Sequence, residues 1–301
     1  MKKITRSTVA RLLPVRKQAA HKGDFGRVLV VAGSRTMCGA GFLCAKSALV
    51  AGAGLVYWAL PQSMQPAFAA ALPEVITLPL PETKTGELSK SAWTILSAFI
   101  KKTKPSLLAI GPGMGESPLL KNLLTKVDLP LVLDADALNA LARESKISFK
   151  NPVILTPHPG ESARLLKMSA ANTPQERLAQ VAQLAQQTKA VCVLKGHHTL
   201  VAQVQSAACV QVWQNTTGGP ALAKGGSGDV LTGLIAGLWA QAGTKDGFDV
   251  ISAFQMAACA VYIHGLAGDL AGKTRGVYGV LATDIISFIP AAFQQILSKE
   301  K

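Results

Sequence analysis

The chain has 301 residues, of which 49% are hydrophobic, so it is long enough to bury one large core and too apolar to be disordered. Its formal net charge of +14 favours anionic ligands, but only 5% of the residues are aromatic and no basic helix carries interleaved aromatics, which disfavours a nucleic-acid-binding surface. Residues 1–27 carry eight basic side chains against one acid, Asp24. We therefore expect a basic leading arm over residues 1–20, followed by one domain over residues 21–301.

Cysteine usage and the uncharged stretches of the sequence indicate the compartment. The five cysteines show no CxxC spacing and lie in apolar neighbourhoods, which predicts buried, reduced thiols: Cys38, Cys44, Cys192, Cys209 and Cys259. The long uncharged stretches 47–73 and 250–268 contain prolines or polar residues, so neither predicts a membrane span. Arg11 and Pro14 interrupt any apolar region that a secretory signal would need. We expect a cytoplasmic protein without membrane contact.

Strand-like and helix-like segments alternate along the chain. Residues 27–32 form a β-branched apolar run typical of a buried strand, 39–52 have helical spacing, and 54–59 predict a second strand. Such a βαβ unit implies a parallel sheet. The alternation continues with strands expected at 74–80, 106–110, 130–133, 152–155, 191–194 and 200–204, and helices at 88–100, 174–188, 228–243, 249–271 and 281–298. The fold class is therefore α/β.

Glycines and charged side chains follow several of these strands, at the edge where open α/β sheets bind ligands. The loop 111–115 holds three glycines, which favours close approach of a ligand over an ordinary turn. Asp134 follows the next strand, where its carboxylate is either a ligand contact or a helix cap. His158 lies between two prolines that fix its backbone, which favours a role in the site over a structural one. Lys195 ends a later strand and suits a nucleotide phosphate, with a solvated turn as the alternative.

The stretch 215–238 begins as a polar loop and ends as an apolar helical run. Three glycines in four positions, Gly226 and Gly228 among them, permit positive φ and leave amide groups uncovered at the helix start, which suits a phosphate. A carboxylate beside such a site, Asp229, would repel the ligand unless it takes a proton from an attacking hydroxyl. The alternative is a tight turn in which Ser227 or Asp229 merely caps the helix.

In their order along the chain, these motifs resemble the ADP-dependent NAD(P)H-hydrate dehydratase family of the ribokinase-like superfold. The resemblance extends from about His21 to Pro290 and rests on these segments: His21–Arg27, Gly33-Ser34, Gly111–Gly115, Asp134–Leu138, Thr156–Glu161, Lys195-Gly196, and Asn215–Thr217 with Gly225–Asp229. It implies a ribokinase-like fold in a single domain, with a central, mostly parallel sheet and helices on both faces. One segment, Gly219–Lys224, departs from the Asn-Pro-Gly-Met-Ala-Thr type usual in the family.

The family resemblance implies a repair enzyme that dehydrates hydrated NADH or NADPH back to NAD(P)H. Bacterial members use ADP and eukaryotic ones typically ATP, with Mg²⁺ as cofactor. The ring hydroxyl is phosphorylated and then leaves as phosphate, so that ADP gives AMP. The resemblance also implies a homo-oligomer such as a tetramer. Because few residues precede His21, we expect the NAD(P)H-hydrate epimerase that accompanies many family members to come from another chain.

By the same resemblance, Asp229 is the base and the amides of Gly226, Ser227 and Gly228 stabilise the transferred phosphoryl group. The hydrated dinucleotide is expected to contact Ala40, Gly113, His158 and Asp229. The nucleotide co-substrate is expected to contact Lys195, Gly196, His197, His198, Thr199 and Gly228. Glu161 is expected to act on Mg²⁺ through water.

Two other functions share part of this pattern. A small-alcohol or vitamin-precursor kinase of the same superfold would also use a glycine loop with an aspartate, but its sugar-kinase relatives commonly have asparagine where this chain has His158. A catalytically silent nucleotide- or nucleic-acid-binding protein would fit the basic leading arm. The complete glycine loop and Asp229 disfavour this second alternative.

Overall fold

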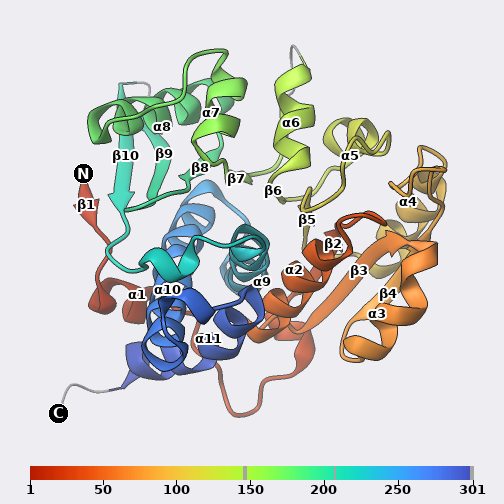
Figure 1. Ribbon diagram of the computed structural model, residues 1–301, viewed down its shortest axis with the longest axis horizontal. Helices are drawn as coiled ribbons and strands as arrows, with labels where there is room; N and C mark the ends of the chain where they lie inside the picture. Colours follow the sequence, from red (N-terminus) through yellow and green to blue (C-terminus); the bar gives the residue numbers. More distant parts are fainter. Residues whose placement is uncertain (145–147, 207, 299–301) are drawn as a thin grey trace.

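The computed structural model describes residues 1–144, 148–206 and 208–298, so residues 299–301 of the expected domain lie outside the described part. A single sheet of ten strands crosses the described chain (Figure 1). The strands are β1 (Lys2–Lys3), β2 (Arg27–Val31), β3 (Leu55–Pro61), β4 (Ile76–Leu80), β5 (Leu107–Ile110), β6 (Leu131–Leu133), β7 (Val153–Leu155), β8 (Val191–Leu194), β9 (Leu200–Ser206) and β10 (Cys209–Gln214). Their spatial order is β1-β10-β9-β8-β7-β6-β5-β2-β3-β4.

The central strands are parallel, as the βαβ pattern predicts. Pairing is parallel from β4 through β3, β2, β5, β6 and β7 to β8. Only β9 runs antiparallel to its two neighbours, because a short turn joins it to β8 and a hairpin joins it to β10. The carboxyl ends of the parallel strands therefore lie along one edge of the sheet.

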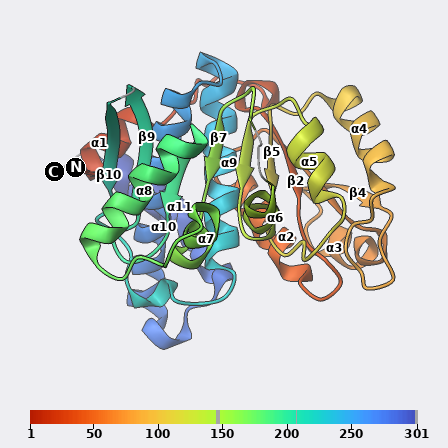
Figure 2. The same cartoon turned by 90° about the horizontal axis from the view of Figure 1, so that it is seen from above.

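Helices cover both faces of the sheet (Figures 1 and 2). One face holds α1 (Arg6–Leu12), α2 (Cys38–Val50), α3 (Gln65–Ala71), α9 (Ser227–Asp246), α10 (Val250–Arg275) and α11 (Ala282–Leu297). The other holds α4 (Ala92–Thr103), α5 (Leu120–Lys126), α6 (Asp136–Arg143), α7 (Pro159–Leu166) and α8 (Pro174–Thr188). The alternation of side chains along β2 divides the core accordingly, since Val28 and Val30 pack on the first face and Leu29 and Val31 on the second.

Two glycines bring α9 unusually close to α2. A Cβ on Gly233 would lie 2.0 Å from the carbonyl oxygen of Cys44, and one on Gly237 would lie 2.4 Å from that of Ala48. Any side chain at these positions would push the helices apart. The close packing fixes where α9 begins, which matters because its first turn faces the ligand edge of the sheet.

Helix α10 is the one described helix that is long and apolar enough to cross a membrane by length and composition. However, 67% of its apolar window is buried inside the fold. It lies against α9 and α11 (Figure 1), so its hydrophobicity on all sides is explained by core packing.

Several elements differ from the sequence-based expectation. The helix expected at 88–100 begins only at Ala92, because Leu88 forms a β-bridge with Glu82. The first residues are part of the fold: β1 pairs with β10, and Ile4 is fully buried. The expectation that all cysteines are buried is wrong for Cys209, which is exposed, and for Cys38, which is half-buried; all five are free thiols.

Candidate active site

Loops from separate strand ends meet at the carboxyl edge of the sheet. The amide of Lys195 donates to the carbonyl of Pro157 at 2.8 Å, and that of Gly33 to the carbonyl of Pro112 at 2.8 Å. The amide of Asp134, in turn, continues the sheet by donating to Ile110 at 3.0 Å. These backbone bonds join loops whose side chains the sequence singles out separately.

A buried ion pair forms the centre of this edge. The ammonium of Lys195 donates to Oδ1 of Asp134 at 2.6 Å and lies 3.8 Å from Oε2 of Glu161. The other oxygen of Asp134 accepts a hydrogen bond from the hydroxyl of Thr232 in α9 at 2.8 Å. Burial alone would lower the pKa of Lys195, but the charges of Asp134 and Glu161 outweigh it and hold this pKa above its ordinary value. Lys195 is therefore a permanent cation.

Asp134 does not cap the helix that follows it, and its contact with a ligand stays a prediction. Ala135, with a φ of 48°, is the residue that precedes the first turn of α6, and no side chain caps that helix. The Asp134 carboxylate instead holds Lys195 and Thr232, and it is 1% exposed. The residue thus joins β6 to β8 and α9 through its side chain.

The first turn of α9 has uncovered amide groups. Gly226 precedes it with a φ of 89°, and no side chain caps the helix, so the interpretation of Ser227 or Asp229 as a cap is wrong. The amide of Ser227 donates to the carbonyl of Lys224 at 3.3 Å. Among the described residues, nothing accepts a hydrogen bond from the amide of Gly228, and a Cβ there would lie 3.6 Å from the Lys195 ammonium. An anion placed here meets a helix N-terminus and a cation together.

Asp229 lies in the same turn, and its pKa is strongly perturbed. Burial, together with the nearby charge of Asp134, raises this pKa to about 7, and Lys195 offsets part of the shift. A carboxylate with a pKa near neutrality can accept a proton from a hydroxyl better than an ordinary aspartate can.

The raised pKa of Asp229 predicts a specific dependence of stability on pH. The folded state binds this proton more tightly than the unfolded chain, so the contribution to folding is present below about pH 4 and is lost as the pH rises through about 7. We expect Asp229→Asn to gain unfolding free energy relative to the wild type between about pH 5 and pH 8, on the order of a few kcal/mol by urea denaturation.

The matched control for this experiment is Asp246→Asn, which removes an exposed carboxylate at the other end of the same helix. Its difference from the wild type should stay constant over the same pH range. A constant difference for Asp229→Asn as well would show that Asp229 titrates as an ordinary aspartate.

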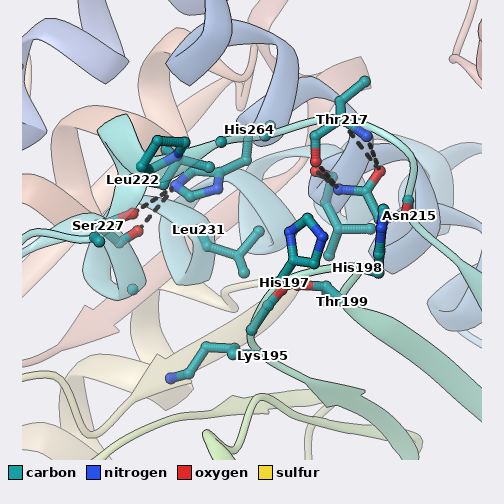
Figure 3. A pocket seen from close by; sticks show the side chains of 18 of the residues that line it. Lys195, His197, His198, Thr199, Asn215, Thr217, Leu222, Ser227, Leu231 and His264 are labelled. Atoms are coloured by element: carbon teal, nitrogen blue, oxygen red, sulfur yellow. Dashed lines mark hydrogen bonds between the residues drawn. The ribbon is translucent and has the colours of Figure 1, made fainter. Parts of the chain in front are cut away.

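A pocket of about 820 Å³ opens beside this turn (Figure 3). All the residues expected to bind the nucleotide line it: Lys195, Gly196, His197, His198, Thr199 and Gly228. The opposite wall comes from the loop after β10, where the Asn215 side chain donates to the carbonyls of Thr217 and Val261 at 3.0 Å. The imidazoles of His197 and His198 lie with their centroids 3.8 Å apart at this surface.

His264 also lines the pocket and was not singled out from the sequence. Its Nε2 donates to the carbonyl of Ser227 at 3.0 Å and lies 3.3 Å from the hydroxyl of the same residue (Figure 3). Burial lowers the pKa of His264 to about 4, so the ring is neutral. Two sequence signals could have found it: a polar residue inside an apolar helical run, and the family resemblance, which includes the segment Val261–Asp269.

Arg177 of α8 holds the turn that carries Lys195. Its guanidinium donates to the carbonyls of His197 at 2.5 Å, Leu194 at 3.4 Å and Lys195 at 3.5 Å. Gly196, with a φ of 140°, passes so close that a Cβ would lie 2.9 Å from this guanidinium. The arginine therefore stabilises one wall of the pocket from behind.

We expect Arg177→Met to raise the KM for the nucleotide about tenfold with a smaller change in kcat, because three carbonyls lose their donor and the turn loosens. Steady-state kinetics with the nucleotide varied measures this. Gln186→Met, on an exposed position of the same helix, should leave KM unchanged. Equal behaviour of the two variants would contradict the role of Arg177.

The residues expected to bind the substrate lie outside this pocket. Ala40 and Gly113 are neighbours, since a Cβ on Gly113 would lie 2.8 Å from that of Ala40. His158 remains 49% exposed, while its Nδ1 accepts from the amide of Gly160 at 3.0 Å and so caps α7. The geometry thus gives His158 a capping role, and its contact with the substrate stays a prediction.

No three His, Cys, Asp or Glu side chains in the described ranges form a group that could hold a metal ion directly. The buried carboxylate of Glu161 accepts from the amide of His158 at 2.8 Å and faces Lys195 at 3.8 Å. A contact of Glu161 with a metal through water is compatible with this arrangement, because Mg²⁺ keeps most of its water and is commonly bound through substrate phosphates.

Comparison with known proteins finds the family that the sequence motifs resemble. The family model described as NAD(P)H-hydrate dehydratase matches residues 28–291. A bifunctional NAD(P)H-hydrate repair enzyme of Moorella thermoacetica is 43% identical over 290 residues, which cover 94% of this chain and 52% of that protein. The chain thus spans about half the length of the curated relatives it matches.

Two solved structures share the fold over nearly the whole chain. An ADP/ATP-dependent NAD(P)H-hydrate dehydratase from Bacillus subtilis, co-crystallised with ATP and Mg²⁺, has a TM-score of 0.81 and 29% identity, covering 98% of each chain. A ribokinase-like superfamily protein from Enterococcus faecalis has a TM-score of 0.78 and 27% identity, covering 98% of this chain and 96% of that one. The ribokinase-like fold expected from the sequence is confirmed.

Proposed function

The chain belongs to the NAD(P)H-hydrate dehydratase family, and we propose that it restores NADH or NADPH from their hydrated forms at the expense of ADP or ATP. One observation carries this proposal: Lys195 and Gly228 place a cation and a free amide at one end of the nucleotide-sized pocket, and Asp229, a carboxylate of raised pKa, follows Gly228 in the same helical turn. Phosphoryl transfer to a hydroxyl uses a base for the hydroxyl and positive groups for the transferred phosphoryl.

Asp229 begins the reaction by taking the proton of the ring hydroxyl. The hydroxyl oxygen forms a bond to the terminal phosphorus of the nucleotide, and the bond from that phosphorus to the leaving nucleotide breaks, giving AMP from ADP. Lys195 and the amide of Gly228 stabilise the charge on the transferred group. The ring nitrogen then expels phosphate by breaking the carbon–oxygen bond, and loss of a proton from the adjacent ring carbon restores the double bond.

Magnesium is part of this proposal. When bound, it neutralises charge on the nucleotide phosphates. In this chain Glu161 would contact it through water, and Lys195 already supplies the fixed positive charge between the carboxylates of Asp134 and Glu161. The co-crystallisation of the Bacillus subtilis relative with ATP and Mg²⁺ supports the use of both.

The test is incubation of the protein with hydrated NADH or NADPH, Mg²⁺ and either ADP or ATP. Recovery of the reduced-nicotinamide absorbance, with stoichiometric phosphate, is the expected result. No recovery with either nucleotide would overturn the proposal. A phosphorylated alcohol that accumulates with ATP preferred would favour a kinase of the same superfold.

Partners of the reaction follow from the same relatives. The curated relatives are called bifunctional NAD(P)H-hydrate repair enzymes. That an NAD(P)H-hydrate epimerase from another chain serves the same substrate stays a prediction. A homo-oligomer and a cytoplasmic location remain predictions, to be measured by light scattering of the purified protein and by cell fractionation.

A further inference from the structure

A second recess lies between α6 and α7. Its volume is about 480 Å³, and Asn139, Ala142, Arg143 and Arg164 line it. The two helices run side by side in both views (Figures 1 and 2). None of these four residues has a part in the chemistry described above.

Arg164 gives the recess a positive charge. Its Nε donates to Oδ1 of Asn139 at 3.1 Å, and among the described residues it forms no ion pair. Arg143 differs, because it pairs with Glu116 at 2.7 Å. The guanidinium of Arg164 thus keeps most of its donors for a ligand, and its planar geometry suits phosphate oxygens.

Arg164 also lies close to the loop 156–161, one of the two loops expected to bind the substrate. A Cβ on Gly160 would lie 2.8 Å from Cε1 of His158 and 3.7 Å from Nη1 of Arg164. The imidazole of His158 and the guanidinium of Arg164 therefore both lie next to Gly160. A ligand that contacts the exposed side of His158 also comes within reach of Arg164.

Contacts of Asn139 lead to the other of these loops, residues 111–115. Its Nδ2 lies 3.5 Å from Oδ1 of Asp136, whose other oxygen accepts from the amide of Gly115 at 2.7 Å. The chain of contacts from Arg164 through Asn139 and Asp136 ends at Gly115, in the same loop as Gly113. The recess is thus linked to both loops.

We propose that Arg164, with Asn139, binds phosphate oxygens of the hydrated dinucleotide. This inference rests on the proposed function. If the nicotinamide ring lies at Asp229 and the co-substrate fills the pocket of about 820 Å³, the rest of the dinucleotide leaves the site along the loops at His158 and Gly113. That part of the substrate carries the diphosphate and, in NADPH, a further phosphate on the ribose, so it needs an unpaired cation on this side.

The test compares Arg164→Gln with the wild type on three substrates: hydrated NADH, hydrated NADPH and the hydrated reduced nicotinamide riboside, which carries no phosphate. For both dinucleotides we expect KM to rise about tenfold or more with kcat changed less, and KM for ADP to stay the same. The riboside should be unaffected, because it offers no phosphate to Arg164. A larger loss for NADPH would assign Arg164 to the ribose phosphate, and equal losses would assign it to the diphosphate.

Two further variants separate charge from structure. Arg164→Lys should recover part of the loss, and Arg11→Gln, which removes an exposed arginine from α1, should leave every KM unchanged. An unchanged KM for the dinucleotides in Arg164→Gln, or an equal loss with the riboside, would overturn the inference.

Binding measurements keep the inference independent of turnover. Calorimetric titration with NADH and NADPH, compared with the reduced nicotinamide riboside, should show the same selective loss in Arg164→Gln even if the wild type fails to repair any hydrate. If the wild type repairs no hydrate but Arg164→Gln still shows the selective loss of dinucleotide binding, only the proposed function is contradicted. Equal binding of the dinucleotides by both proteins would count against Arg164.

Discussion

Replacement of Asp229 with asparagine is expected to lower kcat about 10³- to 10⁴-fold, the range for removal of a positioned general base. Asparagine has nearly the same shape, but it cannot take the proton of the ring hydroxyl. The uncovered amide of Gly228 and the cation of Lys195 are left in place. Nucleotide affinity should therefore change by no more than a few-fold, as measured by calorimetric titration with ADP and with ATP.

The contrast between turnover and affinity makes this test specific. A variant that loses both would show that Asp229 acts on binding or on the shape of the first turn of α9. Near-normal turnover in Asp229→Asn would show that another group takes the proton. The wild-type rate should also rise with pH through about 7, the pKa of Asp229, and the variant should lack this dependence.

Replacement of Lys195 with methionine is expected to have the second largest effect. Turnover should fall about 10²- to 10³-fold, since the charge on the transferred phosphoryl group loses its nearest fixed cation. Stability should fall by about 3 kcal/mol as well, because Asp134 and Glu161 remain buried without a counter-charge. Single-turnover kinetics and urea denaturation measure the two effects separately.

The double variant Lys195→Met with Asp134→Asn separates the two roles of the lysine. Removing the buried carboxylate at the same time should restore much of the lost stability, because the remaining amide can still contact Thr232. Turnover should stay low. Recovery of turnover together with stability would mean that Lys195 serves the fold and not the phosphoryl group.

Much of the fold follows from local sequence patterns. The β-branched run at 27–32 is buried on both faces, which is why it predicts a central parallel strand, and β2 confirms it. The strand-end loops at 111–115 and 156–161 meet at one edge because the strands that carry them are parallel. The position of the site was therefore predictable.

The contacts that tune the site were not predictable, because they join residues far apart in the chain. Lys195 and Asp134 form an ion pair although they are 61 residues apart in the sequence. His264 and Ser227 are hydrogen-bonded and 37 residues apart. The short helices α5, α6 and α7 hold too few turns for their apolar periodicity to stand out. Strand β1 has only two residues and is defined by its partner β10. In each case tertiary packing supplies what local propensity lacks.

In the proposed mechanism, the ring hydroxyl leaves as phosphate. Hydrated NADH prepared in water enriched in oxygen-18 carries the label in that hydroxyl, and one turnover with ADP in ordinary water shows where the label goes. We predict that the oxygen-18 appears in inorganic phosphate, detected by its isotope shift in phosphorus NMR, with one AMP formed for each NADH. Labelled water together with unlabelled phosphate would contradict the mechanism.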